Sequence, residues 1–455
     1  MLLLKRITIP HKKILVQPWM TKGIQTSSNK AQKMFIKCAK SRRSDESHKR
    51  YVTYRNILNK LKYKAKKEYY RSILNEYKHD MKKTWKTINN IIGRSNVKHK
   101  GTQDFKMGNT CTSDTSLISN GFCEYFTNIG PNLAGNIPNP KNNALHYLQK
   151  INRNPNSFFM TPTNPEEILE IIKEIKSKNS SGHDTINTKL IKSIDNSISK
   201  PISILINMSI QSGIVPDSLK LAKIIPIYKS KSPGEFSNYR PISLLTSLSK
   251  ILEKIVHKRL YSFLENECIL NPNQFGFRKK HSTIDAVTKF ISDITTSLDN
   301  KESTIAIYLD LSKAFDTINH TLLLKKLDHY GIRGLPLAWF KSYLENRKHY
   351  IEYKKHTSRT CKIECGVPQG SIVGPLLFLL YINDLPNIIK NAKTILYADD
   401  TTIYVSGKNL GNLREIINSE ISILSDWFRA NKLSLNEGKT NYMHVHDIYK
   451  FEPSR

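Results

Sequence analysis

Apolar residues recur every three or four positions along residues 54–92, with lysine and arginine between them. This period predicts an amphipathic helix whose apolar stripe packs against a neighbouring element. The basic face between the apolar positions has two interpretations, a solvated surface or a surface that lies along a phosphate backbone. The predicted stripe consists of Tyr54, Leu58, Leu61, Ala65, Tyr69, Ile73, Tyr77, Met81, Trp85, Ile88 and Ile92.

The pattern changes twice after this helix. Residues 101–157 are rich in Asn, Gly, Pro, Ser and Thr and show weak periodicity, which predicts loops and a connector. From residue 164 onward, helical periods alternate with runs of strand-forming residues. Interspersed helices and strands indicate an α+β domain. Helices are predicted over 165–175, most of 189–211 and 249–265, and strands over 221–228 and 304–311.

Composition narrows the partner. The 455 residues carry 71 Lys and Arg against 38 Asp and Glu, a formal charge of +33, and residues 37–100 alone contribute +15. Such an excess favours a polyanionic partner, and it favours the phosphate-binding interpretation of the basic helix. The longest apolar stretch, 372–382, contains Gly374 and Pro375 and falls short of the ~20 residues that span a bilayer. Nucleic acid is therefore the expected partner, and no membrane association is expected.

The cysteines change the picture little. Six cysteines in this length show no CxxC pair and no paired histidine spacing, so neither a disulfide scaffold nor a structural zinc site is expected. The amino terminus has only three leucines before a lysine, too few for a secretory signal. We therefore expect an intracellular protein of the nucleus and cytoplasm with reduced thiols.

Three carboxylates lie at predicted strand ends. The strand ending at residue 309 runs directly into Asp310, and residues 394–405 predict a β-hairpin with Asp399 and Asp400 at its tip. Either feature alone is typical of a solvated strand end or an ordinary Asp-Asp turn. Together they predict a hard-oxygen site suited to Mg²⁺. Two such ions about 3.5–4 Å apart activate an attacking hydroxyl and stabilise a leaving pyrophosphate.

A tight loop of small residues, 366–371, precedes a predicted helix with Ser371 as its expected N-cap. By itself it is typical of an ordinary helix-initiating turn. Small-residue loops at helix N-termini also accept phosphate and allow the close approach of a base pair. This loop is therefore a candidate part of the same site.

The motifs in chain order resemble those of reverse transcriptases from non-LTR (LINE-type, jockey-like) retrotransposons. The detailed resemblance runs over residues 206–442, and a weaker likeness extends upstream to residues 18–24 and 181–186. The motifs are FSNYRPISLL (236–245), NQFGFRKKHST (273–283), YLDLSKAFDTINH (308–320), GVPQGSIVGPLLFLLYINDL (366–385), YADD (397–400) and LSLNEGKT (433–440).

The resemblance implies roles for the three acids and for one lysine. Asp310, Asp399 and Asp400 match the family's metal-binding triad, with two Mg²⁺ ions as cofactor and Mn²⁺ as an alternative. Lys439 matches a lysine that protonates the leaving pyrophosphate. As a lone lysine in a glycine turn it would more often be inert.

The resemblance also implies a nucleotide pocket. Gln369 and Gly370 match the loop against the incoming nucleotide and template, and Arg240 matches a fingers residue that grips the triphosphate. Lys250 is a weaker candidate for that grip. Phe315 matches the steric gate, a ring that fills the space of a ribose 2′-hydroxyl and so favours deoxynucleotides. Without the resemblance Phe315 would be a core aromatic and Arg240 a solvated charge.

The implied fold is a right-hand polymerase fingers and palm, preceded by a basic α-helical N-terminal extension. The thumb is expected to be missing, because the family continues beyond Lys439 into a primer-gripping hairpin and a helical thumb. Expected domains are a remnant of an endonuclease-to-polymerase connector (1–45), a basic amphipathic helical segment (46–100), a loop-rich connector (101–158), an N-terminal helical extension of the fingers (159–207) and the reverse transcriptase domain (208–455).

The expected function is RNA-directed DNA polymerisation, with template RNA, a DNA primer or target and deoxynucleoside triphosphates as partners. Two alternatives remain open at this point. A truncated, catalytically weak remnant would only bind nucleic acid, and a group II intron-type maturase would mainly assist RNA folding. Primer extension on an RNA template separates the first alternative from the polymerase.

Overall fold

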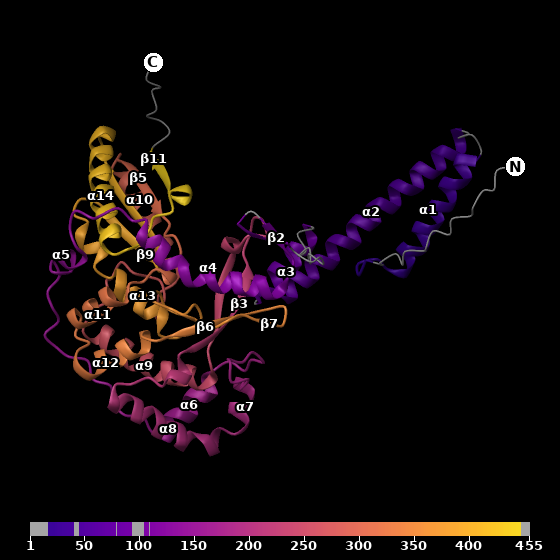
Figure 1. Ribbon diagram of the computed structural model, residues 1–455. Coiled ribbons are helices and arrows are strands. Elements are labelled where there is room, and N and C mark those ends of the chain that lie inside the picture. The colour runs from indigo at the N-terminus through magenta and orange to yellow at the C-terminus, as the bar shows by residue number, and fades with distance from the viewer. Residues whose placement is uncertain (1–16, 41–44, 79, 93–103, 109, 447–455) are drawn as a thin grey trace. The chain divides into compact units, whose positions relative to one another are not determined.

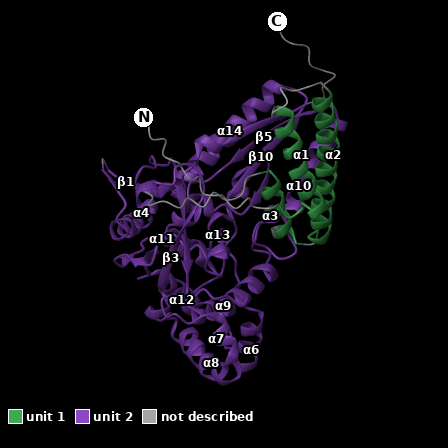
Figure 2. Ribbon diagram, turned by 90° about the vertical axis from the view of Figure 1, so that its right-hand side faces the viewer, with its two compact units in different colours: residues 1–101 green, residues 102–455 purple. Residues whose placement is uncertain are grey.

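A computed structural model describes residues 17–40, 45–78, 80–92, 104–108 and 110–446. The chain divides into two compact units, residues 1–101 and 102–455 (Figure 2). Among the described residues, no helix is long and apolar enough to cross a membrane.

The first unit consists of three helices, α1 (Lys22–Lys40), α2 (Asp45–Glu76) and α3 (Met81–Ile91). Helices α1 and α2 pack against each other, and the rings of Phe35 and Tyr51 lie 5.5 Å apart between their centroids. The prediction of one continuous helix over 54–92 is wrong. Asp80 ends the run because its carboxylate accepts a hydrogen bond from the Lys83 amide, 3.1 Å away, and so starts a new helix.

The apolar stripe of this unit packs less completely than predicted. Leu58 is the one stripe residue that is fully buried, whereas Leu61, Met81, Trp85 and Ile92 are more than half exposed. Much of the apolar surface between the basic residues is therefore open in this unit.

The second unit contains an antiparallel sheet with the strand order β11-β5-β10-β9. Its strands are β5 (Ser303–Leu309), β9 (Lys393–Tyr397), β10 (Asp400–Gly407) and β11 (Asn441–Val445). Alternate residues of β5 enter different clusters: Ile305 and Ile307 pack with the side of helix α14 (Leu410–Ala430), and Ala306 packs with helix α10 (Thr283–Asp299). The two helices therefore cover opposite faces of this sheet.

A second sheet has the strand order β4-β3-β6-β7, with β8 also paired to β6. Strand β3 is antiparallel to β4 and parallel to β6. The sheet consists of β3 (Leu221–Tyr228), β4 (Tyr239–Leu244), β6 (Lys348–Tyr353), β7 (His356–Thr357) and β8 (Cys361–Lys362). The predicted strand over 221–228 is confirmed.

Helix α4 (Thr115–Gly135) packs on this second sheet and corrects the prediction of loops over 101–157. Asp114 caps it by accepting a hydrogen bond from the Ser116 amide at 2.7 Å. Gly and Pro residues within the helix weaken its periodicity in the sequence. The buried residues Ile118, Phe122 and Phe126 nevertheless recur every four positions, and the Phe122 ring packs against the rings of Phe105 and Tyr239. Short elements β1 (Phe105–Met107), β2 (Thr110–Thr112) and α5 (Ala144–Leu148) complete this region.

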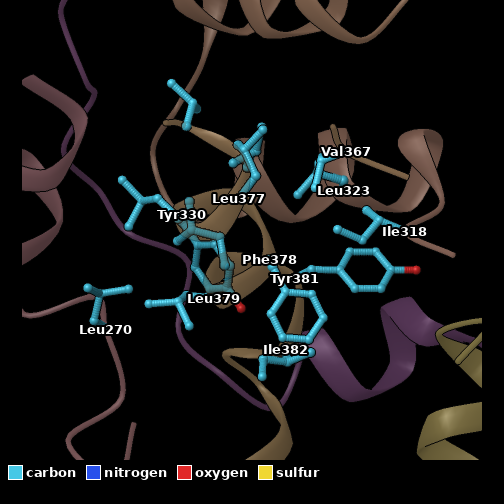
Figure 3. Close-up of a cluster of buried hydrophobic side chains, with 14 of the residues drawn as sticks. Leu270, Ile318, Leu323, Tyr330, Val367, Leu377, Phe378, Leu379, Tyr381 and Ile382 are labelled. Carbon is cyan, nitrogen blue, oxygen red and sulfur yellow. The ribbon is translucent and has the colours of Figure 1, made fainter. Parts of the chain in front are cut away.

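Helix α13 (Gly374–Ile382) is buried along its length, and its side chains from Leu376 to Ile382 are all buried (Figure 3). It packs against α11 (His320–His329), which also contacts α12 (Gly334–Leu344). The helices predicted over 165–175 and 249–265 are confirmed, and the one over 189–211 is divided at Ile194. Helices α6 (Pro165–Glu174), α7 (Thr188–Ser193) and α8 (Asp195–Ser212) form a group at the bottom of Figure 1, where α6 contacts α9 (Ser247–Asn266) and α8 contacts α12. Short 3-10 segments are η1 (Asp217–Leu219), η2 (Phe236–Asn238), η3 (Ala314–Asp316), η4 (Leu385–Ile388) and η5 (Glu437–Lys439).

Candidate active site

Two adjacent strands of the first sheet deliver the predicted acids to one edge. Leu309, the last residue of β5, pairs with Thr401 of β10, so Asp310 follows β5 beside the start of β10. Strands β9 and β10 form the predicted hairpin, with Asp400 paired to Tyr397 across its turn. The hairpin prediction is thus confirmed, and the pairing explains why residues 90 positions apart in sequence meet here.

The turn of the hairpin is supported from behind by residues 274–276. Ala398 has a left-handed φ of 56°, and its amide donates to the buried Gln274 Oε1 at 2.9 Å. A Cβ on Gly276 would collide with the Ala398 backbone. Gln274 and Gly276 therefore set the position of Asp399, a supporting role that the motif around residue 274 did not suggest by itself.

The three carboxylates influence one another electrostatically. Burial raises the pKa of Asp399, and the negative charge of Asp310 raises it further. Burial also raises the pKa of Asp400, with added contributions from the charges of Asp399 and Asp310. The edge of the sheet is thus a region of negative potential that a cation would relieve.

Asp310 has two side-chain partners from the segment that follows α14. Its Oδ2 accepts hydrogen bonds from Lys439 Nζ at 2.9 Å and Asn436 Nδ2 at 2.8 Å. The backbones also join, because the Asn436 amide donates to the Asp310 carbonyl at 2.8 Å. The structure therefore brings Lys439 to the acids, as the prediction of its role requires.

The fit to a metal ion rests on donor chemistry rather than on a formed coordination shell. Among the described residues, no group of three or more His, Cys, Asp or Glu side chains is placed to hold a metal ion. Asp310 is neutralised by the Lys439 ammonium instead. Carboxylate oxygens in a negative potential are the donors that divalent hard cations prefer, so these residues fit such an ion chemically. The assignment of the triad as ligands stays a prediction.

Cations gather around the acids. Arg240 lies on β4, and its charge lowers the pKa of Asp399. Lys229 lies just after β3, near charges of both signs. Burial and the charges of Lys439 and Arg240 lower its pKa, whereas the charges of Asp310 and Asp399 oppose this change. Lys229 was not among the predicted residues, although it follows a predicted strand directly.

Lys313 is a second cation that the sequence reasoning missed. It has a left-handed φ of 53°, and its Nζ donates to the Tyr239 carbonyl at 3.4 Å. Burial lowers its pKa, and the charges of Lys229, Arg240 and Lys439 lower it further. Four cationic side chains thus lie within electrostatic reach of one another beside the acids, an arrangement suited to a polyphosphate.

Lys250 lies elsewhere. On helix α9 its charged neighbours are Lys178, Glu253 and Asp184, and burial lowers its pKa. The structure does not bring Lys250 to the acids.

Phe315 lies in η3, five residues after Asp310. Its ring stacks on Phe378 with centroids 4.8 Å apart and meets the edge of Phe277 at 6.1 Å. It is partly buried and packs against the main core. Both the gate and the core interpretation of this ring are compatible with these contacts.

Gln369 and Gly370 lie on a loop that is tied to strand β4. The Ser243 amide donates to the Gln369 carbonyl at 2.8 Å. Gly370 has a φ of 130°, and a Cβ there would crowd the Ser243 carbonyl, so glycine is required. The prediction of Ser371 as N-cap is wrong, because α13 begins at Gly374 with Val373 as N-cap. The Ser371 hydroxyl still accepts from the Gly374 amide at 3.1 Å, one turn before the helix proper.

Helix α4 lies directly behind this loop. A Cβ on Gly130 would collide with the Asp316 carbonyl oxygen and with Cys365 Sγ. A segment predicted to be a loop is therefore a helix that touches the residues next to Phe315. The apolar four-residue spacing of Ile118, Phe122 and Phe126 was the signal that could have revealed it.

The comparisons agree with the geometry. Residues 227–451 match the family described as "Reverse transcriptase (RNA-dependent DNA polymerase)". The chain is 32% identical over 290 residues to the "Probable RNA-directed DNA polymerase from transposon X-element" of Drosophila melanogaster, which covers 62% of this chain and 32% of that protein. It is 28% identical over 282 residues to the "RNA-directed DNA polymerase from mobile element jockey" of the same organism, covering 60% of this chain and 31% of that protein. The chain thus spans about a third of the length of these relatives.

Proposed function

We propose that the chain is the polymerase part of a non-LTR retrotransposon protein that copies RNA into DNA, because residues 227–451 match the reverse transcriptase family. The observation that carries the proposal is the meeting of Asp310 and Asp399 with the cations Arg240, Lys229 and Lys439 at one sheet edge. Acids that suit a divalent ion, beside cations that suit a triphosphate, are what nucleotide transfer needs.

In the proposed reaction, the 3′-hydroxyl of a DNA primer attacks the α-phosphorus of a deoxynucleoside triphosphate. A P–O bond forms between the primer oxygen and the α-phosphorus, and the hydroxyl proton passes to solvent. The bond from the α-phosphorus to the oxygen that bridges to the β-phosphorus breaks, and pyrophosphate leaves with that oxygen. Reverse transcriptases generally use divalent metal ions. Asp310, Asp399 and Asp400 would hold two Mg²⁺ ions, which activate the hydroxyl and stabilise the leaving pyrophosphate when bound.

The other residues act on the nucleotide. Arg240, Lys229 and Lys313 bind the triphosphate by charge, and the Lys439 ammonium, which now contacts Asp310, donates a proton to the departing pyrophosphate. Phe315 excludes a ribose 2′-hydroxyl. Gln369 and Gly370 lie against the nucleotide and the template base.

The two sheets take different parts in this proposal. The sheet that holds the acids is the palm, and the sheet of β3, β4 and β6 with α4 is the fingers. The basic helices α2 and α3 bind the RNA template or the product duplex. The domain boundaries at 45, 100, 158 and 207 are part of the proposal.

Primer extension on an RNA template with deoxynucleoside triphosphates and Mg²⁺ tests the function. We expect extension by the unchanged chain and loss of at least about 10³-fold in rate for Asp310→Ala or Asp399→Ala. RNA affinity should stay within about twofold in both variants, because the basic surface is unchanged. Asp299→Ala, an exposed acid at the end of α10, is the matched control and should extend normally.

The same experiment separates the alternative. An unchanged chain that binds RNA and extends no primer would be a nucleic-acid-binding remnant. Full extension by either triad variant would remove the acids from the mechanism.

A further inference from the structure

The loop that holds Gln369 is fastened to the segment that holds Phe315. The Val367 amide donates to the Phe315 carbonyl at 2.9 Å, and the Gly366 amide donates to the Ile318 carbonyl at 2.8 Å. The His320 ring Nε2 lies 2.7 Å from the Gly366 carbonyl oxygen. Hydrogen bonds therefore join the loop that holds Gln369 to the segment that holds Phe315.

One side-chain contact within this piece has no part in the proposed reaction. Gln369 Nε2 donates to both carboxylate oxygens of Asp316, at 2.9 Å to Oδ1 and 2.8 Å to Oδ2. Among the described residues, no other hydrogen bond reaches that carboxylate. The Gln369 NH₂ group is thus turned toward Asp316, and among the described residues no hydrogen bond reaches the side-chain carbonyl oxygen Oε1 of Gln369, which can accept from another partner.

The surroundings of Asp316 hold it in place. Helix α4 closes one side, because Gly130 lies against the Asp316 backbone, and Cys365 Sγ donates to the Asp316 carbonyl at 3.4 Å. Burial desolvates the carboxylate and raises its pKa to about 6, and Gln369 and Lys313 partly offset that rise. Burying a carboxylate costs free energy unless it is hydrogen-bonded. Beside the charge of Lys313, the Gln369 amide is the side-chain group that offsets this cost.

We propose that Asp316 is a positioning residue for nucleotide selection, which fixes the Gln369 amide so that its carbonyl oxygen faces the nucleotide. This inference rests on the proposed polymerase function. An amide can turn by 180° and present either its NH₂ or its carbonyl oxygen. An ionised carboxylate only accepts hydrogen bonds, so it tolerates one orientation. Gln369 then offers an acceptor to a donor group of the incoming nucleotide.

Asp316→Asn removes this discrimination with little change in shape. An asparagine amide offers one acceptor and one donor, so either orientation of Gln369 finds a partner. We expect the KM for deoxynucleoside triphosphate to rise at least about tenfold, the size that losing one charge-assisted hydrogen bond gives. The value of kcat should stay within about twofold, because the substitution replaces none of the acids or cations, and the lost Asp316 charge acts on Lys313, which is assigned to nucleotide binding. Asp316→Glu keeps an acceptor-only group and should lie between the two.

A double-mutant cycle shows whether Asp316 acts through Gln369. If it does, Asp316→Asn should change KM by less than about twofold in a Gln369→Ala background. Multiplied effects in the double variant, or an unchanged KM in the Asp316→Asn variant, would overturn the inference. Asp299→Asn is the matched surface control.

A binding measurement separates this inference from the proposed function and does not depend on turnover. The unchanged chain is loaded with a dideoxy-terminated primer on RNA, and nucleotide-dependent retention is followed against a trap RNA with Ca²⁺ as the ion. Retention by the unchanged chain with an equal nucleotide requirement in Asp316→Asn refutes the inference alone. No nucleotide-dependent retention and no extension by the unchanged chain refutes both. Thermal unfolding of each variant identifies one that fails to fold, and Asp316→Glu then carries the comparison.

Discussion

Phe315 packs against two aromatic rings, Phe378 and Phe277, which fix its position. A smaller side chain at residue 315 should therefore enlarge the space on the side that faces away from these rings. It stacks on the buried Phe378 and touches the edge of the exposed Phe277. Such a ring can act as a steric barrier, because packing and not the ligand sets its position.

Phe315→Val should open that barrier. We expect the ratio of ribonucleotide to deoxynucleotide incorporation efficiency to rise at least about tenfold, since the space for a 2′-hydroxyl is no longer filled. The measurement is kcat/KM for both nucleotide types on one RNA template. Phe290→Val, an aromatic on the opposite side of the palm sheet beside Tyr404, is the control. A constant ratio would make Phe315 a core residue only.

The carboxyl of Asp316 should make nucleotide binding sensitive to pH. Its pKa of about 6 in the folded protein lies above the usual aspartate pKa of 3.8, so its proton stabilises the fold below pH 3.8, and this contribution is lost as pH rises through 6. Function runs the other way, because only the ionised carboxyl accepts both Gln369 hydrogen bonds. We expect KM for the nucleotide to rise as pH falls through about 6, and this inflection to be missing in Asp316→Asn.

Other groups near Asp316 do not produce the same inflection. Burial and the Asp316 charge raise the pKa of Tyr125, and they raise that of Cys365 to about 11. Lys313 has a pKa lowered by burial from 10.5, with the Asp316 charge opposing that shift. The raised pKa values of Asp399 and Asp400 affect every variant equally. Burial lowers the pKa of His320, whose ring contacts the Gly366 carbonyl, and this group is also the same in every variant. An inflection that persists in Asp316→Asn would therefore belong to those acids or to His320.

The sequence predicted the acids and two of the cations beside them, Arg240 and Lys439, but not Lys229 and Lys313. Asp310, Asp399 and Asp400 stand directly after or within strand-forming runs, so their place at a sheet edge follows from the sequence. Lys229 and Lys313 are two of 71 basic residues, and only the pairing of β3 with β4 and the left-handed backbone at Lys313 bring them to the site. The Asp316–Gln369 contact joins residues 53 positions apart and has no local signal.

At the scale of elements, segments with a clear residue pattern were predicted, and segments without one were missed. Strand β3 is rich in strand-forming residues and has the predicted bounds, and helices α6 and α9 lie where a helical period predicted them. Helix α4 was missed because Gly121 and Gly130 fall where neighbours leave no room for a side chain, against Phe236 and Asp316 respectively. Glycine there signals close packing, although in sequence it suggests a loop.

The helices α2 and α3 carry a prediction of their own. Replacing Lys62, Lys66, Lys67 and Lys83 by glutamine should weaken RNA binding. The slope of log affinity against log salt should flatten by about 0.7–0.9 for each lost phosphate contact. Filter binding across a salt series measures it.

The control for this prediction uses four exposed lysines of the second unit, Lys189, Lys200, Lys301 and Lys408. Replacing them by glutamine removes the same charge, so a flattening confined to α2 and α3 identifies a local contact. An unchanged slope in the α2 and α3 variant would leave those lysines as a solvated face.

At the scale of the whole molecule, one buried ion pair joins three helices of the second unit. Lys326 Nζ on α11 contacts Asp384 Oδ1 and the Tyr381 carbonyl, both at 2.6 Å. Trp427 Nε1 of α14 donates to Asp384 Oδ2 at 3.1 Å. Both charges are almost fully buried, so each depends on the other.

Lys326→Met should lower the free energy of unfolding by about 3–5 kcal/mol, because it leaves the Asp384 carboxylate buried without an opposite charge. Urea unfolding followed by tryptophan fluorescence measures the change. Lys325→Met, at the exposed neighbouring position, should cost less than about 0.5 kcal/mol. Adding Asp384→Leu to Lys326→Met should restore part of the loss, and no recovery would mean that the lysine acts through packing alone.

The large core of the second unit has a consequence for how such a chain can be inherited in pieces. The family match begins at residue 227, inside β3, whereas the core draws its buried residues from Ala144 to Leu433. Ile168 and Ile202 pack in the same cluster as Ile255 and Leu327. The stretch that matches the family, residues 227–451, is therefore not a module that recombination could exchange alone. A crossover at residue 227 would divide strand β3 and separate the core from the buried residues upstream. Recombination that exchanges the polymerase would therefore have to include the helices upstream of residue 227.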